Sequence, residues 1–270
     1  MEEENKKKIV ALKDLGPCLP IGIKSASGSY GKSIGLRAWK LKHEKMLSAA
    51  KEKAKKLTAA QYANIVLRTM CTELGDVSLE GLSEKDAKQT IGQMYMGDVL
   101  YAYVWLRYQA IGHVMESKLK CGSCGHDFVF PADLETLDVK TVDKVEDAYW
   151  EYELQDPIEI RGKRLAKMVF GPAKWGALEA MSPGQLNEGA MKEMLIRASF
   201  VENPEDKSFF FSMGDLDEMS KRDLEKISDK FDDNHIGPDM SLETSCPACN
   251  YEFKVAINWA ADDFFGGSSR

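Results

Sequence analysis

Two stretches of this sequence decide its fold: Cys121-Gly-Ser-Cys124-Gly-His-Asp-Phe128-Val-Phe130 and Cys246-Pro-Ala-Cys249-Asn-Tyr-Glu-Phe253-Lys-Val255. In each, two cysteines separated by two residues bracket a tight turn, a residue that tolerates positive φ follows, and an apolar strand leads away. This arrangement is typical of zinc knuckles. Structural zinc takes four cysteine sulfurs at about 2.3 Å. The two pairs together therefore predict one structural zinc per chain, bound by Cys121, Cys124, Cys246 and Cys249.

The spacing of the two pairs is unusual, because 121 residues separate them where a ribbon of this kind has about 12 to 20. A single zinc site would therefore require a whole subdomain between the two halves of the ribbon. Such an insertion costs little, because the entropy cost of closing a loop rises slowly with its length. Two other interpretations remain open: half-sites completed by a partner or a second copy, and metal-free packing or redox pairing. His126 is a candidate substitute ligand, although a turn histidine more often faces solvent. Cys18 and Cys71 are interpreted as unpaired arm and core residues.

Catalytic motifs are weak in this chain. Four thiolates fill the coordination shell of zinc, so the ion has no open position for water or substrate. The four histidines have no serine or cysteine elbow near them. Ala26-Ser-Gly-Ser-Tyr-Gly-Lys-Ser33 matches a permissive phosphate-binding loop, but no apolar strand precedes it. The sequence therefore predicts a non-enzymatic protein with no small-molecule substrate.

Composition limits the remaining classes. The chain has 270 residues, of which 44% are hydrophobic and 29% charged, as expected for a folded globular protein. Its net charge of −7 argues against nonspecific nucleic-acid binding. The charged start lacks an apolar signal segment, and the stretch from Val99 to Val114 is too short and too polar for a membrane span. We expect a protein of the cytoplasm with no membrane partner.

The patterns along the chain predict an α+β fold: a mostly helical body, a small β-hairpin and a zinc ribbon assembled from the two distant knuckles. Alternating residues around Gly162 indicate the hairpin, and Ser83 and Ser220 are candidate helix N-caps. The expected segments are an extended N-terminal arm (1–35), a helical region (36–116), the first knuckle (117–132), an inserted mixed α/β region (133–240), and the second knuckle with an aromatic tail (241–270).

Charge is unevenly distributed. Eight lysines and arginines against two glutamates lie between Arg37 and Lys56, whereas ten acids against two lysines lie between Pro131 and Glu159. Both stretches are interpreted either as solvated surface or as complementary patches for docking. The acidic, aromatic end of the chain is interpreted either as a last strand and turn packed on the ribbon or as a partner anchor. The candidate partner-binding residues are Arg37, Lys40, Trp259, Phe264 and Phe265.

The order of several motifs resembles the baseplate hub assembly and hub subunit family of contractile-tailed, T-even-type phages. The resemblance covers roughly residues 36 to 265 and is carried by Leu36-Arg-Ala-Trp-Lys-Leu-Lys-His-Glu44, Met96-Gly-Asp98 ahead of an apolar helix with Arg107, Ile158-Glu-Ile-Arg-Gly-Lys-Arg164, Met219-Ser-Lys-Arg-Asp-Leu-Glu225, the two knuckles and Phe264-Phe265. The sequence departs from the family's usual pattern at Asn250, where glycine is common, and in its lysine-rich first helix. Asparagine also tolerates the left-handed conformation, so the zinc site is not threatened.

The resemblance implies a role in building or forming the hub of the baseplate, through contacts with other phage tail proteins. It also implies a location in the host cytoplasm during assembly and in the tail baseplate of the virion. The alternative from another class is a zinc-ribbon nucleic-acid-binding protein of the late-gene regulator type. A DNA affinity that falls steeply with salt would favour that alternative.

Overall fold

The computed structural model of the chain describes residues 7–24, 28–53, 57–212, 214–260 and 264–265. The α-helices are α1 (Leu12–Leu15), α2 (Leu41–Lys53), α3 (Ala59–Met70), α4 (Glu84–Gln93), α5 (Met96–Ile111), α6 (Trp175–Glu179), α7 (Glu188–Ser199) and α8 (Lys221–Asn234). Short 3-10 helices are η1 (Leu134–Thr136), η2 (Val145–Ala148), η3 (Pro183–Gln185) and η4 (Asp215–Glu218). The strands are β1 (Lys8–Ala11), β2 (Cys18–Lys24), β3 (Tyr30–Leu36), β4 (Cys71–Leu74), β5 (Val77–Ser78), β6 (Val114–Lys120), β7 (Asp127–Asp133), β8 (Asp138–Thr141), β9 (Trp150–Ile160), β10 (Lys163–Phe170), β11 (Phe200–Glu202), β12 (Gly237–Pro238), β13 (Ser241–Ser245) and β14 (Glu252–Ala256).

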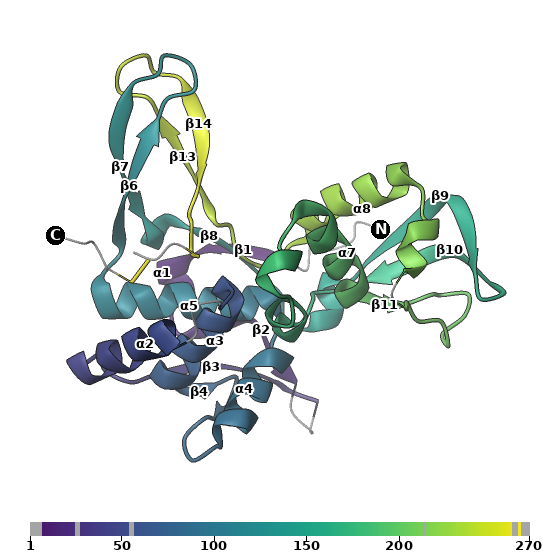
Figure 1. Cartoon of the computed structure of the whole chain (residues 1–270), viewed down its shortest axis with the longest axis horizontal. Coiled ribbons are helices and arrows are strands. Elements are labelled where there is room, and N and C mark those ends of the chain that lie inside the picture. The colour runs from purple at the N-terminus through teal and green to yellow at the C-terminus, as the bar shows by residue number, and fades with distance from the viewer. Residues whose placement is uncertain (1–6, 25–27, 54–56, 213, 261–263, 266–270) are drawn as a thin grey trace.

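Strands make up nearly as much of the chain as helices. Of the residues that the structure describes, about 40% are helical and 32% are in strands, and these strands form five sheets. The prediction of a mostly helical body is therefore wrong. The body contains a four-stranded antiparallel sheet in the order β2-β3-β4-β5, with α3, α4 and α5 beside it (Figure 1).

The sheet begins within the first 35 residues, which sequence reasoning assigned to an extended arm. Leu19 and Ile21 of β2 are fully buried, so this segment belongs to the core. The glycines that look like markers of a loose segment have a packing role instead. A Cβ atom on Gly31 would overlap the carbonyl oxygen of Gly75, so only glycine allows these backbones to approach. Periodicity alone does not distinguish such a strand from an arm.

Several local predictions are confirmed. The Ser83 side chain accepts a hydrogen bond from the Asp86 N–H at the start of α4, and Ser220 does the same at the start of α8. The hairpin expected around Gly162 is the pair β9 and β10. Its turn residues, Arg161 and Gly162, have φ values of 54° and 71°, as a two-residue hairpin turn requires.

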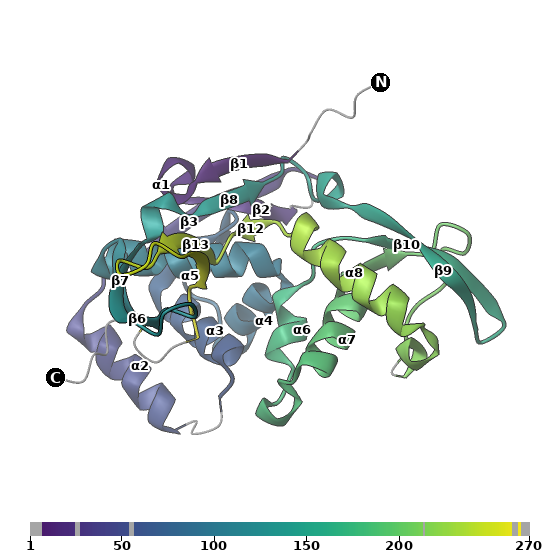
Figure 2. The same cartoon turned by 90° about the horizontal axis from the view of Figure 1, so that it is seen from above.

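The hairpin of β9 and β10 belongs to a second hydrophobic core. β11 joins it in a three-stranded sheet, and α7 and α8 pack nearby. Figure 2 shows this unit at one end of the molecule, with α2 at the opposite end. The buried apolar residues of this core are Tyr152, Leu154, Ile160, Leu165, Met168, Phe170, Ile196, Phe209, Leu216, Met219 and Ile227.

Helix α5 connects the parts of the molecule. At its start, the buried Asp98 accepts hydrogen bonds from the backbone N–H groups of Ile21 at 2.8 Å and Gly22 at 3.0 Å. The preceding Gly97 touches the backbone of Ile236 and Gly237, at the entry to β12. Gly97 and Asp98 of α5 thus contact both the sheet β2-β3-β4-β5 and the segment that leads to the second knuckle.

The pH dependence of stability tests the role of Asp98. Burial raises its pKa from 3.8 to about 6, against the opposing effect of the two N–H donors. The folded state then holds this proton more tightly than the unfolded chain, so the contribution of Asp98 to the free energy of unfolding falls between pH 4 and pH 6. The expected fall is at most about 3 kcal/mol.

The comparison uses Asp98→Asn, which lacks the titrating proton. We expect the unfolding free energy of the wild type minus that of the variant to decrease from pH 4 to pH 6 and to stay constant above. Both proteins carry the same cysteines, so acid-induced loss of a bound metal cancels in the difference. An increase over this range would mean that the N–H donors outweigh burial.

Candidate metal centre

Two β-hairpins carry four cysteines at their tips. β6 pairs with β7 and β13 pairs with β14, both antiparallel and in continuous register. Figure 1 shows the hairpins side by side above the body, with their tips together. Cys124 and Cys246, which are 122 positions apart in the sequence, are neighbours there. We call this pair of hairpins the ribbon.

The turns at the two tips have the same geometry. In the first, the Cys121 N–H donates to the His126 carbonyl at 2.9 Å, and the Cys121 carbonyl accepts from the Gly125 N–H at 3.0 Å. The second tip repeats both bonds at 3.0 and 2.8 Å. Gly125 and Asn250 occupy matching left-handed positions with φ values of 75° and 57°. Asparagine therefore replaces glycine at this turn without changing its shape.

The four sulfur atoms form a compact cluster. The Sγ atoms of Cys121, Cys124, Cys246 and Cys249 all lie within 4.8 Å of one another. The Sγ distance is 3.7 Å between Cys121 and Cys249 and 3.6 Å between Cys124 and Cys246. Tetrahedral coordination with metal–sulfur bonds of about 2.3 Å spaces neighbouring sulfurs about 3.8 Å apart. A disulfide would need about 2.05 Å. The donor set therefore fits a four-sulfur metal centre that joins the hairpins.

Each tip places one cysteine inside and one outside. Cys121 and Cys246 are buried, whereas Cys124 and Cys249 are exposed. The backbone N–H groups of Cys124 and Ser123 stabilise the Cys121 thiolate and lower the pKa of that thiol to about 6, against the opposing effect of burial. The backbone N–H of His126 acts to lower the pKa of the Cys124 thiol, but hydrogen bonds with the sulfurs of the other three cysteines and burial outweigh it and raise this pKa to about 12. Since the thiolate is the form that binds metal, the turn favours Cys121 as a ligand more than Cys124.

Aromatic rings support the tips. Phe128 and Phe253 meet edge to face across the two hairpins, with ring centroids 6.2 Å apart. His126 stacks on Phe128, and Tyr251 stacks on Phe253 in the equivalent place. The sequence analysis considered His126 as a substitute ligand. Its ring instead occupies the position that tyrosine takes in the other hairpin.

The base of the ribbon is fixed by Arg107 near the end of α5. Its side chain is buried, and its guanidinium donates to the carbonyl of Gly112 and, at 3.0 Å, to that of Val114. Val114 is the first residue of β6. Arg107 therefore attaches the first hairpin to the body, a role that sequence periodicity did not reveal.

A second cluster at this base was also missed. His113, Asp133 and Glu135 place their donor atoms within 4.8 Å of one another. The pKa of His113 is raised, chiefly by its hydrogen bond to Asp133 at 3.0 Å. His113 lies between α5 and β6, Asp133 ends β7 and Glu135 lies in η1, so the pairing of β6 with β7 brings them together. Their geometry is that of an ion pair.

The basic candidate residues lie on one side of the body. The Arg37 guanidinium donates to the Thr69 carbonyl at 2.9 Å and forms an ion pair with Glu80 at 3.3 Å. These contacts occupy Arg37 within the chain itself. Lys40 is exposed.

The aromatic end of the chain packs onto α5. Phe264 is 1% exposed and stacks on Tyr103 at 5.3 Å, so it is a core residue and not an exposed anchor. Trp259 meets the same ring edge to face. Phe265 is only partly buried and stacks on Trp39, with ring centroids 5.3 Å apart. Trp259, Phe264 and Phe265 thus pack on the body.

Other motifs have structural positions. The loop from 26 to 33 lies partly outside the described residues, but Lys32 sits in strand β3 and donates to the Val142 carbonyl at 2.6 Å. Cys71 is fully buried, which raises its pKa to about 12. Cys18 is half-buried in β2. Neither Cys18 nor Cys71 belongs to the cluster of four cysteine sulfurs.

The described helices include none that is long and apolar enough to cross a membrane. No curated protein and no solved structure matches the chain significantly. One family model does match: that of the T4 bacteriophage base plate protein, over residues 22–175. This region holds α5, the first knuckle, the end of β2 and all of β3, β4 and β5, and it spans more than half of the 270 residues. The chain therefore belongs to the family of T4 bacteriophage base plate proteins.

Proposed function

We propose that this protein is a non-enzymatic component that builds or forms part of the baseplate hub, through contacts with other tail proteins. The match to the baseplate family over residues 22–175 supports a place in the baseplate. The hub position within it rests on the motif order described above. The proposed locations are the host cytoplasm during assembly and the virion tail baseplate.

The ion at the sulfur cluster is proposed to be zinc, one per chain. Four cysteine sulfurs in tetrahedral spacing are the donor set of structural zinc sites. Cys121 and Cys124 would hold it from the first hairpin, and Cys246 and Cys249 from the second. Four protein ligands leave no open position, so the ion would supply stability and no chemistry.

The zinc would fix the ribbon as a rigid projection on the body. A bound metal contributes its binding energy to folding. A baseplate subunit needs surfaces that keep their relative orientation while other subunits dock. The proposed role of the metal is therefore to hold two distant parts of one chain in a single orientation.

Quantitative mass spectrometry of purified particles and of the infected-cell lysate tests the proposed function. The chain is counted relative to a known tail protein. We expect a fixed stoichiometric ratio in particles or in isolated baseplate intermediates. If the chain is absent from both and binds DNA with an affinity that falls steeply with salt, the hub proposal is wrong and the nucleic-acid alternative holds.

A further inference from the structure

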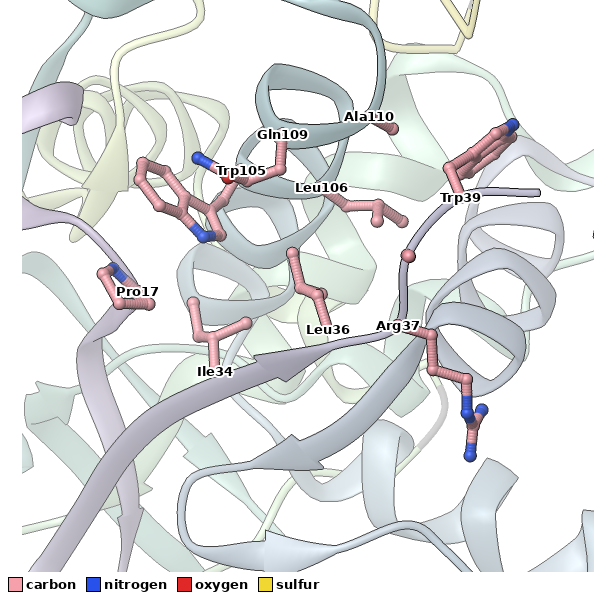
Figure 3. Close-up of a pocket in the computed structure, with 10 residues that line it drawn as sticks. Pro17, Ile34, Leu36, Arg37, Trp39, Trp105, Leu106, Gln109 and Ala110 are labelled. Atoms are coloured by element: carbon pink, nitrogen blue, oxygen red, sulfur yellow. The ribbon is translucent and has the colours of Figure 1, made fainter.

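A groove lies between β3 and α5, away from the ribbon tips, and polar and apolar atoms contribute about equally to its lining. It has a volume of about 490 Å³. Figure 3 shows Ile34 and Leu36 of β3 pointing toward Trp105 and Leu106 of α5, with Pro17 at one end. A groove of this size, walled in part by apolar side chains, is a candidate binding site for another molecule.

The aromatic side chains of the groove walls are held by neighbouring residues. Trp105 is 8% exposed and stacks against Tyr101 on one side and Tyr108 on the other. Trp39 closes the other end, and its indole N–H donates to Glu44 at 3.0 Å. A docking segment would therefore meet a preformed surface and would lose little affinity to ordering of the groove.

The surface next to the groove is apolar and basic. Leu41 follows Trp39 closely in the chain and is 63% exposed, and Met46 on the same helix is 57% exposed. Lys40, Lys42 and Lys45 are also exposed. The nearby acid Glu44 is already bonded to Trp39. An incoming segment thus meets positive charge beside apolar side chains.

The chain itself provides one example of what this surface accepts. Phe265 stacks on Trp39 with an interplanar angle of 5°. Phe265 belongs to the sequence Trp259-Ala-Ala-Asp-Asp-Phe-Phe265, which is both acidic and aromatic. One face of Trp39 therefore already binds an aromatic residue from an acidic stretch, at the end of the groove.

We propose that this groove binds an acidic segment with an aromatic or large aliphatic side chain, presented by a different tail protein. The apolar side chain fills the space between β3 and α5, and the acids face Lys40 and Lys42. The charge supplies specificity and a faster association. This inference rests on the proposed function and deepens it, because it names the surface through which the hub component docks.

Photo-crosslinking during infection tests the groove in the full-length protein. Gln109, an exposed residue on the groove wall, is replaced by benzoylphenylalanine. The same replacement at the exposed Lys226 of α8 is the control. We expect a crosslink from position 109, and none from position 226, to a net acidic segment with an apolar anchor in another tail protein.

Charge reversal in the same background tests the recognition. The double variant Lys40→Glu with Lys42→Glu is expected to lower the crosslink yield about tenfold or more, because like charges now face each other. The matched reversal of Lys85 and Lys226, two exposed lysines on other helices, is expected to leave the yield within about twofold. Equal losses in both double variants would contradict the proposed recognition.

The outcomes separate this inference from the proposed function. The groove proposal is overturned if position 109 crosslinks to a second copy of this chain or to a basic segment. It is also overturned if no crosslink forms in baseplates that contain the chain. Each of these outcomes leaves the hub role standing. A charge-sensitive crosslink to an acidic segment, with the chain absent from baseplates, supports the groove and overturns the hub role.

Discussion

Replacing Cys121 with serine is expected to abolish zinc binding and to unfold both hairpins of the ribbon. Cys121 is buried, and its sulfur lies 3.7 Å from that of Cys249 in the other hairpin. Apparent zinc-binding free energies of about 10 to 16 kcal/mol stabilise small structural sites. Losing even part of this stabilisation lowers the unfolding temperature by on the order of 10 °C or more in a chain of this size.

The measurements are zinc content by elemental analysis, thermal unfolding, and limited proteolysis. We expect zinc to fall from one per chain to nearly none, with new cleavage in both β6–β7 and β13–β14. Cys18→Ser is the control, because Cys18 lies outside the sulfur cluster. It should keep one zinc and a nearly unchanged unfolding temperature. Cleavage confined to the first hairpin would show that the two knuckles do not share an ion.

Replacing Gly97 with alanine is expected to destabilise the junction between α5 and β12 strongly. A Cβ at this position would lie 2.8 Å from the carbonyl carbon of Ile236 and would overlap its oxygen. Both partners are backbone, so no flexible side chain can move aside. Overpacking of this kind costs about 1 to 3 kcal/mol and sometimes more. We expect a loss at the upper end of this range, measured by chemical unfolding.

Gly92→Ala provides a matched control in α4. There the added Cβ would lie 3.7 Å from the Gly176 Cα, which is ordinary contact. Since alanine favours helix over glycine by about 1 kcal/mol, this variant should be neutral or slightly more stable. If Gly97→Ala were as mild as Gly92→Ala, α5 and the segment before β12 would not be in close contact.

The local features of this fold could be predicted from sequence because each depends on neighbouring residues. The spacing of two cysteine pairs and a following residue that tolerates positive φ predicted the hairpin tips and the four donors. Ser83 and Ser220 predicted helix starts through bonds to backbone N–H groups three residues later. The turn at Gly162 followed from alternation on both sides.

The remaining features depend on contacts between distant segments, which periodicity does not record. Gly31 looked like part of a loose arm, yet its missing side chain allows β3 to meet the turn after β4. The sequence left open whether Phe264 packs on the ribbon or anchors a partner, and it stacks instead on Tyr103 of a helix far back in the chain. Asp98 and Arg107 were noticed only through the resemblance to a family. The backbone N–H groups of β2 require an acceptor such as Asp98, and the carbonyl at the start of β6 requires a donor such as Arg107.

X-ray absorption spectroscopy at the zinc edge on the purified full-length protein tests the central claim most directly. The account predicts one zinc per chain surrounded by four sulfur atoms at about 2.3 Å. A first shell with nitrogen or oxygen ligands, fewer than four sulfurs, or protein that carries no zinc when purified and resists loading would contradict the claim that the two knuckles share one structural ion.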